Sequence, residues 1–530
     1  MTNVPSWWRE AVLYQIYVRS FADSDGDGIG DLRGIVARLD HLAWLGVDAI
    51  WLSPIHPSPD QDWGYDVADY YGVHPELGQR GDVEWLIREA GRRGIRVLLD
   101  LVPNHTSDRH PWFVDAKSSR SAQRRDWYVW ADGRPDGAPP NNWRSSFGGP
   151  AWSFDDATGQ WYLHHFLPSQ PDLNWWSGAV RESFDAILRH WFDRGVAGMR
   201  IDVCNMIVKD RELRDNPPAT DADPAFLRML GQRQVYDSGR PELHDVLRRW
   251  RRIADGYAPP RLLLGETYVF DLAELASFYG SGDELSLAFN MPFVFAPLEA
   301  GAIGAVVAET ERRLGAEHWP VWTLSNHDVS RFPTRWCEGD GRKVRCALLL
   351  LLGLRGTPVL YYGDEIGMAD TPIPFEELRD PVGKRFWPAA TGRDPCRTPM
   401  QWDATAGAGF TKPDAEPWLR LGDYRAVNVA TQRGDPGSVL QFCRDLIALR
   451  RAHPELRRGD SAAVDGPPGV LAWRRGGRFT IALNLTQSAV ALCGMDGHVR
   501  LGTDRARDGE PTVDTLTLQP WEGALVETRG

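Results

Sequence analysis

The chain has 530 residues, of which 42% are hydrophobic and 25% charged, and its formal net charge is −12 at pH 7. This length exceeds what one ordinary hydrophobic core supports, so two or three domains are expected. The composition is typical of a soluble globular protein, and the negative charge argues against nucleic acid or an anionic membrane as a partner. A neutral small-molecule substrate fits this charge balance.

The N-terminus and the cysteines indicate a cellular compartment. The first ten residues contain neither a basic nor an apolar segment, so no secretory signal is visible. The longest apolar stretch, Ala347 to Leu354, is too short to span a bilayer. The six cysteines are scattered without a CxxC pair, which is typical of reduced thiols. We therefore expect a cytoplasmic enzyme.

Short apolar runs alternate with helical patterns along most of the chain. Apolar runs bounded by turn signals indicate buried strands, and amphipathic segments such as Leu32–Leu45 and Val180–Phe192 indicate helices. The expected strands, in chain order, are Leu13–Val18, Ala49–Leu52, Arg96–Leu101, Ala197–Ile201, Arg261–Leu264, Leu285–Phe289, Val321–Leu324 and Thr357–Tyr361. Such an alternation of eight strands with helices predicts an α/β fold, a (β/α)8 TIM barrel of parallel strands.

Two long connections and a change of pattern divide the chain further. Residues 106–176, after the third expected strand, are rich in Trp, Gly and Pro and predict a small inserted domain. Residues 363–436 form a second long excursion after the eighth strand. From 458 to 530, short alternating strands predict a C-terminal antiparallel β-sandwich domain. The barrel is therefore expected in two parts, residues 1–105 and 177–457.

Three acidic residues, Asp202, Glu266 and Asp328, each follow a short apolar run. Because an unpaired charge is costly to bury, carboxylates at successive strand ends are expected to face a cleft, a cation or one another. In a barrel of parallel strands, these ends form the active face. A retaining glycosidase needs one carboxylate as nucleophile and a second as acid and then base, about 5 Å apart. The three acids together predict such a site, although each alone is more typical of a salt-bridged or capping residue.

The neighbours of these acids suggest their roles. Arg200 precedes Asp202 by two residues, so a strand places both side chains on one face, where the guanidinium is expected to lower the pKa of Asp202 and keep it ionised as a nucleophile. Glu266 follows an apolar run, a setting that favours the protonated form that a general acid needs. His327 and Asp328 would hydrogen-bond the hydroxyls of a substrate.

Four segments resemble the motifs of the α-amylase family, glycoside hydrolase family 13. They are DLVPNH at Asp100–His105, GMRIDV at Gly198–Val203, the segment around Glu266, and SNHD at Ser325–Asp328. The second has Met199 where the family usually has Phe. This resemblance implies that Asp202 is the nucleophile, Glu266 the acid/base and Asp328 the transition-state stabiliser. It also implies that Arg200 belongs to the substrate pocket.

Two further segments resemble the oligo-1,6-glucosidase and α-glucosidase subfamily, QPDLN at Gln170–Asn174 and RTPMQWD at Arg397–Asp403. The resemblance covers nearly the whole chain and implies small α-linked oligosaccharides as substrates and a monomer or weak homodimer. The leading hypothesis is a retaining exo-acting α-glucosidase that also transfers glucose to sugar hydroxyls.

The resemblance also implies which residues hold the substrate. The segment DWGYD that begins at Asp62 resembles the part of the family that supplies the glucose pocket, where Tyr65 would stack on the terminal glucose. His105 and His327 would bond its hydroxyls. Asp62 and Arg397 would pair and close the pocket at the non-reducing end, and a pocket that admits one terminal sugar makes cleavage exo-acting. Core packing or strand capping is the alternative for Tyr65 and His105.

The segment DSDGDGIGD from Asp23 to Asp31 predicts a site for a hard divalent cation. Oxygen ligands at alternate loop positions suit calcium, and a glycine at position 28 allows the sharp turn. The expected ligands are the side chains of Asp23, Asp25, Asp27 and Asp31 and the carbonyl of Ile29. The segment lacks the final Glu of an EF-hand and resembles the calcium loop after the first strand of α-glucosidases, which implies a structural Ca²⁺ away from the sugar. Magnesium, or a solvated acidic turn, is the alternative.

Val203, directly after the expected nucleophile, bears on the linkage that is cleaved. In the resembling subfamily, Val here accompanies α-1,6 bonds and Ala or Thr accompanies α-1,4 bonds, but a methyl-scale difference shifts preference by only about 1–3 kcal/mol. The long charged loop 207–239 would also wall the cleft, and we expect maltose-type oligosaccharides to be favoured.

Other enzymes and one non-enzyme class remain as alternatives. One is an oligo-1,6-glucosidase, and another is an isomerase such as a trehalose synthase or sucrose isomerase, which uses the same three acids. A catalytically inactive transporter subunit is disfavoured, because all three acids are present and no membrane anchor is visible.

Overall fold

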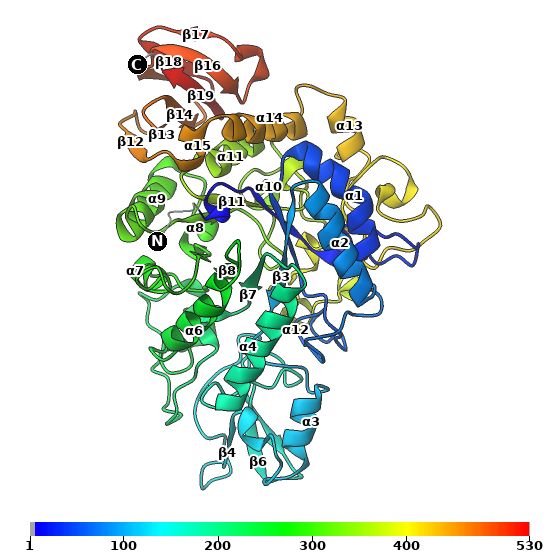
Figure 1. Cartoon of the computed structure of the whole chain (residues 1–530). Coiled ribbons are helices and arrows are strands. Elements are labelled where there is room, and N and C mark those ends of the chain that lie inside the picture. Colours follow the sequence, from blue (N-terminus) through cyan, green and yellow to red (C-terminus); the bar gives the residue numbers. More distant parts are fainter. Residues whose placement is uncertain (1–5, 529–530) are drawn as a thin grey trace.

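The computed structural model describes residues 6–528 and is built around a barrel of eight parallel strands (Figure 1). Their order is β10-β11-β1-β2-β3-β7-β8-β9, and a parallel bridge between Phe289 and Val321 joins the two end strands and closes the barrel. The strands are β1 (Leu13–Ile16), β2 (Ala49–Leu52), β3 (Arg96–Leu101), β7 (Gly198–Ile201), β8 (Leu262–Gly265), β9 (Leu287–Ala288), β10 (Val321–Thr323) and β11 (Thr357–Tyr361). The predicted fold class is confirmed.

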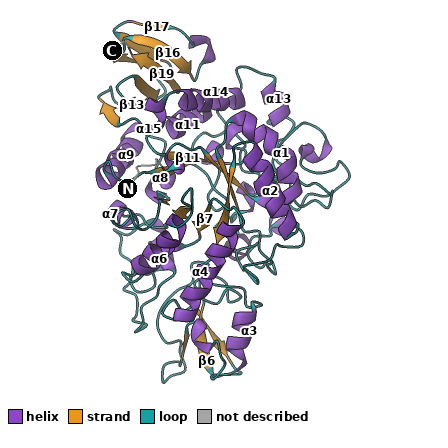
Figure 2. Ribbon diagram, viewed as in Figure 1, coloured by secondary structure: helices purple, strands orange, loops and turns teal. Residues whose placement is uncertain are grey.

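Helices surround the barrel strands (Figure 2). The longer ones are α1 (Leu32–Leu45), α2 (Arg80–Arg92), α4 (Gly178–Asp193), α6 (Leu243–Asp255), α9 (Ala300–Leu314), α11 (Gly341–Gly353) and α14 (Val439–Ala452). The shorter ones are α3 (Pro111–Ser118), α5 (Ala225–Leu230), α7 (Leu272–Ser277), α8 (Met291–Phe295), α10 (Phe332–Arg335), α12 (Pro381–Phe386), α13 (Val429–Arg433) and α15 (Pro454–Arg458). The periodic segment Leu32–Leu45 is helical as predicted, because Asp31 caps its N-terminus and Gly46 ends it in a left-handed conformation.

Alternate residues of each barrel strand face two different cores. Leu13, Trp51 and Leu98 pack inside the barrel, whereas Tyr14 and Ile50 pack between the strands and the helices. Because side chains on a strand point to opposite faces in turn, a strand of the barrel is buried on both sides. The continuous apolar runs seen in the sequence follow from this two-sided burial.

Smaller sheets lie at the two opposite ends of the molecule in Figure 1. One has the order β4-β6-β5 and lies between β3 and α4 in the chain, with β4 (Trp130–Ala131), β5 (Trp152–Asp155) and β6 (Gln160–Leu163). The C-terminal part has a six-stranded sheet, β12-β13-β14-β19-β16-β17, and a two-stranded sheet, β15-β18, which share one apolar core.

The bounds of the C-terminal strands are β12 (Ser461–Val464), β13 (Val470–Arg475), β14 (Phe479–Asn484), β15 (Val490–Cys493), β16 (Gly497–Gly502), β17 (Pro511–Thr512), β18 (Thr515–Leu518) and β19 (Glu522–Thr528). Their pairings are antiparallel. Within residues 6–528, no helix combines the length and apolar character that crossing a membrane requires.

Candidate active site

One guanidinium gathers three carboxylates at the C-terminal ends of neighbouring barrel strands. Asp202 follows β7 directly and lies 2.6 Å from Arg200 Nη1, which also lies 2.9 Å from Asp100 Oδ1 on β3. Arg200 Nη2 lies 2.8 Å from Glu266 Oε2, directly after β8. The parallel register pairs Asp100 with Arg200 across β3 and β7, which places the side chains together. Asp202 and Glu266 thus contact the two terminal nitrogens of the same guanidinium group.

The electrostatics of Asp202 differ from the prediction. Burial raises its pKa well above the usual range, and the negative charges of Glu266 and Asp100 raise it further, although Arg200 opposes both effects. Arg200 does lower the pKa of Asp202 as expected, but the predicted net direction is wrong, since one guanidinium cannot offset burial and two nearby carboxylates. Burial likewise raises the pKa of Asp100 to about 7, against the opposing charge of Arg200. Both Asp100 and Asp202 are thus harder to ionise than an exposed aspartate.

Glu266 does not lie in the apolar setting that was expected. Its Oε2 accepts a hydrogen bond from the backbone N–H of Val203 at 2.9 Å, in addition to the contact with Arg200. Val203 has φ of 44° and ψ of 41°, a left-handed conformation that is costly for a β-branched residue. The residue that follows Asp202 is thus strained, and its N–H forms the hydrogen bond that holds the Glu266 carboxylate in place.

Asp328 belongs to a second charged group that lines the same cavity as Asp202 and Glu266. Arg397 Nη2 lies 2.8 Å from Asp328 Oδ1, and Arg393 Nη1 lies 3.4 Å from the same oxygen. Burial raises the pKa of Asp328, but its interactions with His327 and with the guanidinium groups of Arg397 and Arg393 outweigh burial and hold the pKa below its usual range. Asp328 is therefore a fixed negative charge beside the cluster of Arg200.

The expected pair between Asp62 and Arg397 is not formed. Asp62 Oδ1 lies 2.5 Å from Arg393 Nη2, while Arg397 donates through Nε to the His327 carbonyl at 2.7 Å. Arg393 also lies 2.7 Å from Asp380, so its guanidinium links three carboxylates. The prediction is wrong because both arginines lie in one irregular segment, where the sequence does not indicate which side chain faces Asp62.

Tyr65 and the two histidines form one buried network. The Tyr65 ring stacks on His327 with centroids 5.1 Å apart and 9° between planes, and the Tyr65 hydroxyl bonds both Asp100 and His327. His105 Nε2 lies 3.0 Å from the Tyr65 carbonyl. Burial lowers the pKa of His105 to about 4 and that of His327 well below its usual value. Both imidazoles are therefore neutral at pH 7 and suited to hydrogen bonding.

A cavity of about 380 Å³ connects these groups. Six of the nine predicted catalytic and substrate residues line it, namely Asp62, Tyr65, His105, Asp202, Glu266 and Asp328. The other three, Arg200, His327 and Arg397, are fully buried behind this lining and contact the lining carboxylates. A cavity of this size, lined by acids at strand ends, suits a small molecule.

Residues 15–459 match the family model described as the alpha-amylase catalytic domain. The chain belongs to the α-amylase family. A probable alpha-glucosidase from Rhizobium meliloti (strain 1021) is 45% identical over 481 residues, which cover 88% of this chain and 87% of that protein. An oligo-1,6-glucosidase from Heyndrickxia coagulans is 34% identical over 98% of this chain and 99% of its own. The crystal structure of the alpha-glucosyl transfer enzyme XgtA matches with a TM-score of 0.92 and 40% sequence identity. The match covers 98% of this chain and 100% of that chain.

This member of the α-amylase family is a glycoside hydrolase. Three residues that its site uses were not predicted as site residues, namely Asp100, Gln170 and Arg393. Gln170 Nε2 donates to Asp62 Oδ2 at 3.1 Å and lies 3.2 Å from His105. Asp100 and Gln170 lie inside segments that the motif resemblance singled out, so their position in those motifs was an available signal. For Arg393, only its spacing from Arg397 was visible.

The acidic loop before α1 brings three of its five predicted ligands together. One carboxylate oxygen from each of Asp23, Asp25 and Asp27 lies within 4.8 Å of the others. Asp31 does not join them, because its two oxygens accept hydrogen bonds from the backbone N–H groups of Gly34 and Ser24. Ile29 follows Asp27 in the same loop. The three convergent carboxylates fit a hard cation, and Asp31 serves as the N-cap of the helix.

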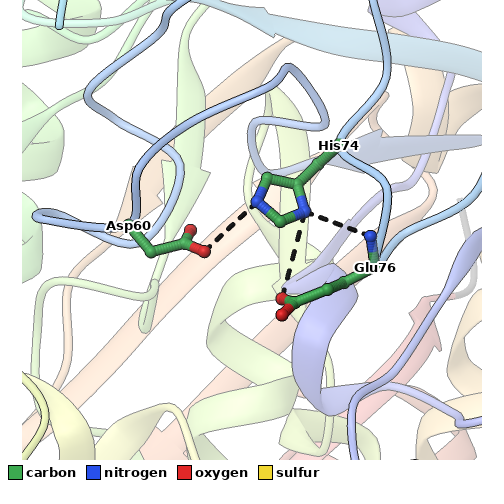
Figure 3. Close-up of side chains that lie close together, drawn as sticks. All are labelled: Asp60, His74 and Glu76. Atoms are coloured by element: carbon green, nitrogen blue, oxygen red, sulfur yellow. Dashed lines mark hydrogen bonds and ion pairs between the residues drawn. The ribbon is translucent and has the colours of Figure 1, made fainter. Parts of the chain in front are cut away.

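A second acidic group, Asp60, His74 and Glu76, also lies close together (Figure 3). His74 Nε2 lies 3.2 Å from Asp60 Oδ2. The guanidinium of Arg19 lies 2.7 Å from each of the two carboxylates. Because Arg19 already supplies the positive charge, this group is an ion-pair network that ties the end of β1 to the loop after β2.

Proposed function

We propose that the protein is a retaining, exo-acting α-glucosidase that releases glucose from the non-reducing end of short α-glucosides. The observation that carries the proposal is that Arg200 bridges Asp202 and Glu266 in the wall of a cavity where Arg393 pairs with Asp62. Two carboxylates that contact the same guanidinium suit the nucleophile and the acid/base of a double displacement. The buried Asp62–Arg393 pair suits a pocket that admits only one terminal sugar.

In the proposed first step, the Asp202 carboxylate attacks the anomeric carbon while Glu266 gives its proton to the departing glycosidic oxygen. In the second, the Glu266 carboxylate takes a proton from water, whose oxygen displaces Asp202 from the anomeric carbon. Arg200 contacts Asp100, Asp202 and Glu266 and keeps the negative charge of this cluster partly compensated during both steps. Asp328 stabilises the positive charge that develops on the sugar ring.

Transfer to a sugar hydroxyl instead of water follows from the same covalent intermediate. The likeness to an alpha-glucosyl transfer enzyme supports this part of the proposal. Maltose-type oligosaccharides are the favoured substrates, and the relative named oligo-1,6-glucosidase supports the main alternative. Val203 lines the cavity, so the side chain linked to α-1,6 preference is in position to contact the leaving sugar.

Initial rates of glucose release from maltose and isomaltose, measured side by side, test the proposal. Faster release from maltose is the expected result and shows that Val203 does not decide the linkage. Faster release from isomaltose makes the protein an oligo-1,6-glucosidase. Loss of maltose or sucrose with little free glucose favours an isomerase, and release of β-glucose contradicts the retaining mechanism.

We further propose that the acidic loop holds a structural Ca²⁺, with Mg²⁺ as the alternative. Asp23, Asp25 and Asp27 would hold the ion and fasten the loop against the segment after residue 409. Asp23 N–H donates to the Phe410 carbonyl at 2.8 Å, which brings the two segments together. A cytoplasmic location and a monomer or weak homodimer complete the proposal. The six free cysteines, of which five are buried, support the location.

A further inference from the structure

Four buried charged side chains lie where two excursions from the barrel meet. His165 and Asp172 belong to the segment between β3 and α4, and Lys209 and Asp237 belong to the segment between β7 and α6. Each of the four side chains is at most 3% exposed. Each segment thus supplies one acid and one base to a single buried group, which the mechanism proposed above does not use.

His165 contacts a carboxylate with each of its two ring nitrogens. Its Nδ1 lies 2.5 Å from Asp172 Oδ2, and its Nε2 lies 3.1 Å from Asp237 Oδ2. An ionised carboxylate only accepts hydrogen bonds, so both contacts are satisfied together only when both ring nitrogens carry a proton. This geometry therefore favours the imidazolium form of His165.

The other contacts of the group leave its charge balanced. Lys209 Nζ lies 2.9 Å from Asp172 Oδ2, and Asn216 Nδ2 donates to Asp237 Oδ1 at 2.9 Å. With a protonated His165, two cations face two carboxylates, which is the arrangement that buried charges need. The pairs between His165 and Asp237 and between Lys209 and Asp172 both cross from one segment to the other.

The electrostatics of His165 agree with this geometry. Burial lowers its pKa, but the carboxylates of Asp172 and Asp237 outweigh burial and raise the pKa above its usual value, against the charge of Lys209. Burial also lowers the pKa of Lys209, and Asp172 opposes this effect. The two other histidines nearby, His105 and His164, are neutral at pH 7, because burial lowers the pKa of each.

His165 holds parts of two walls of the active-site cavity. Its backbone carbonyl accepts a hydrogen bond from the Ser146 N–H at 2.7 Å, and Phe166 follows it in the chain. Both Ser146 and Phe166 line the cavity. Across the boundary, Gln234 lines the same cavity three residues before Asp237. The contact between His165 and Asp237 therefore joins two segments that enclose the substrate.

We propose that His165 is a positioning residue, which as an imidazolium joins the two segments and holds the cavity in its binding geometry. The kinetic part rests on the α-glucosidase function proposed above, whereas the effect on stability does not. When His165 loses its proton, Asp172 and Asp237 share one uncompensated negative charge and weaken the junction. The stabilisation is complete below the ordinary pKa of a histidine, about 6.5, and is lost as the pH rises through the raised pKa.

The variant His165→Gln tests this role, because glutamine is neutral at every pH. At pH 6 we expect its Tm to be lower than that of the wild type by about 4 °C. We also expect KM for maltose to rise by about fivefold while kcat changes by less than about twofold, since the catalytic carboxylates stay at their strand ends. Both differences should shrink as the pH is raised to 9, because the wild type then loses the same charge.

Differences between His165→Gln and the wild type that stay constant from pH 6 to pH 9 overturn the inference. Titration of Asp100 affects both proteins alike and cancels in the comparison. If maltose and other α-glucosides are not cleaved at all, the proposed function fails, and the Tm comparison alone then decides the role of His165.

A second variant tests the charge balance. The double variant His165→Gln with Asp237→Asn again has equal numbers of buried positive and negative charges, so it should regain about half of the Tm that His165→Gln loses at pH 6. Asp237→Asn alone keeps the imidazole but removes one of its carboxylates. Measured against the double variant, its loss of Tm should therefore occur at a pH lower by about one unit than the loss in the wild type. This comparison decides the inference even where His165→Gln does not fold.

His164→Gln is the matched control. His164 is adjacent in the chain and equally buried, but its ring nitrogens contact the Ser153 hydroxyl and the Phe166 carbonyl instead of carboxylates. The Tm difference between this variant and the wild type should not depend on pH. A double variant that is no more stable than His165→Gln, an Asp237→Asn loss at the same pH as the wild type, or a control difference that also closes with pH contradicts the proposal.

Discussion

Arg200 and Arg19 each gather carboxylates, but the two clusters face different surroundings. Arg200 contacts Asp100, Asp202 and Glu266, and two of these acids line the 380 Å³ cavity. Arg19 contacts Asp60 and Glu76, whose side chains are 21% and 44% exposed to solvent. The first cluster has more carboxylates than its guanidinium can neutralise, whereas the second is partly screened by water.

This difference separates a reactive site from a structural one. Buried charges interact strongly and shift their protonation, while solvent screens a partly exposed pair. The pKa of Asp202 is raised well above its usual range, first by burial and then by its carboxylate neighbours. Both clusters consist of the same kinds of side chain, so the reactivity of the Arg200 cluster depends on its burial and on its access to a cavity.

Replacing the nucleophile gives the largest expected effect. Asp202→Asn removes the charge that attacks the anomeric carbon and keeps the shape of the side chain. We expect kcat for α-glucosyl fluoride to fall by about 10⁴-fold or more, as measured by fluoride release, with an unchanged circular dichroism spectrum. Activity close to wild type in this variant contradicts the assigned mechanism.

The corrected ion pair can be tested by a double-mutant cycle. Asp62→Ala and Arg393→Ala each leave a buried charge unpaired, so each lowers kcat/KM, and the double variant is less impaired than the sum predicts. A coupling of about 2 kcal/mol is expected from kcat/KM with maltose. The same cycle with Arg397→Ala serves as comparison and is expected to show weaker coupling to Asp62. If Asp62 couples more strongly to Arg397 than to Arg393, the pair of Asp62 and Arg397 predicted from the sequence is supported instead.

The raised pKa of Asp100 predicts a change in pH dependence. Because the pKa of Asp100 is raised to about 7, this carboxyl ionises near neutral pH and adds a negative charge beside Arg200, so kcat/KM is expected to fall as the pH rises through 7. Asp100→Asn removes this titrating group and keeps the shape of the side chain. The fall of kcat/KM near pH 7 is then expected to disappear. A fall that remains at the same pH in the variant argues against Asp100 as the titrating group.

Much of this site could be predicted, because strand ends and motif spacing are local features. Asp202, Glu266 and Asp328 each follow a buried apolar run, and the barrel brings such positions to one face. The strand β3 occupies the predicted residues 96–101, since two-sided burial makes the whole run apolar. The three acids and the barrel therefore carried signals within short stretches of sequence.

The parts that the prediction missed depend on contacts between distant segments. Asp62 and Arg393 are 331 residues apart, and the choice between Arg393 and Arg397 depends on how an irregular segment folds over the cavity. The raised pKa of Asp202 depends on burial and on Glu266 and Asp100, which adjacent strands bring beside Arg200. The sequence shows only that Arg200 lies near Asp202, whereas the structure also shows the carboxylates of Asp100 and Glu266 beside it.

Removing the proposed calcium is expected to have a moderate effect on stability. EDTA should lower the Tm by about 2–4 °C, because the carboxylates of Asp23, Asp25 and Asp27 then repel one another without an ion. Added Ca²⁺ restores the Tm of the wild type, and Asp25→Asn should weaken this response. A Tm that is insensitive to EDTA and to added Ca²⁺ contradicts the proposed ion.

The smallest effect is expected in the Arg19 cluster, whose two carboxylates are partly exposed to solvent. Glu76→Gln removes one partner of Arg19, but Asp60 still contacts the guanidinium at 2.7 Å. Because the Glu76 side chain is 44% exposed, solvent takes over much of its role, so the Tm should change by less than about 2 °C and less still in high salt. The kcat for α-glucosyl fluoride is expected to stay within about twofold of wild type, in contrast to Asp202→Asn.

The same cluster should not respond to divalent ions. Asp60, His74 and Glu76 lie as close together as the acids of the calcium loop, but Arg19 places a positive charge between the two carboxylates. An added cation would have to displace a guanidinium that holds both. Added Ca²⁺ should therefore raise the Tm of Glu76→Gln as much as that of the wild type. A smaller rise in this variant shows that the cluster binds the ion, and the distinction between the two acidic groups then fails.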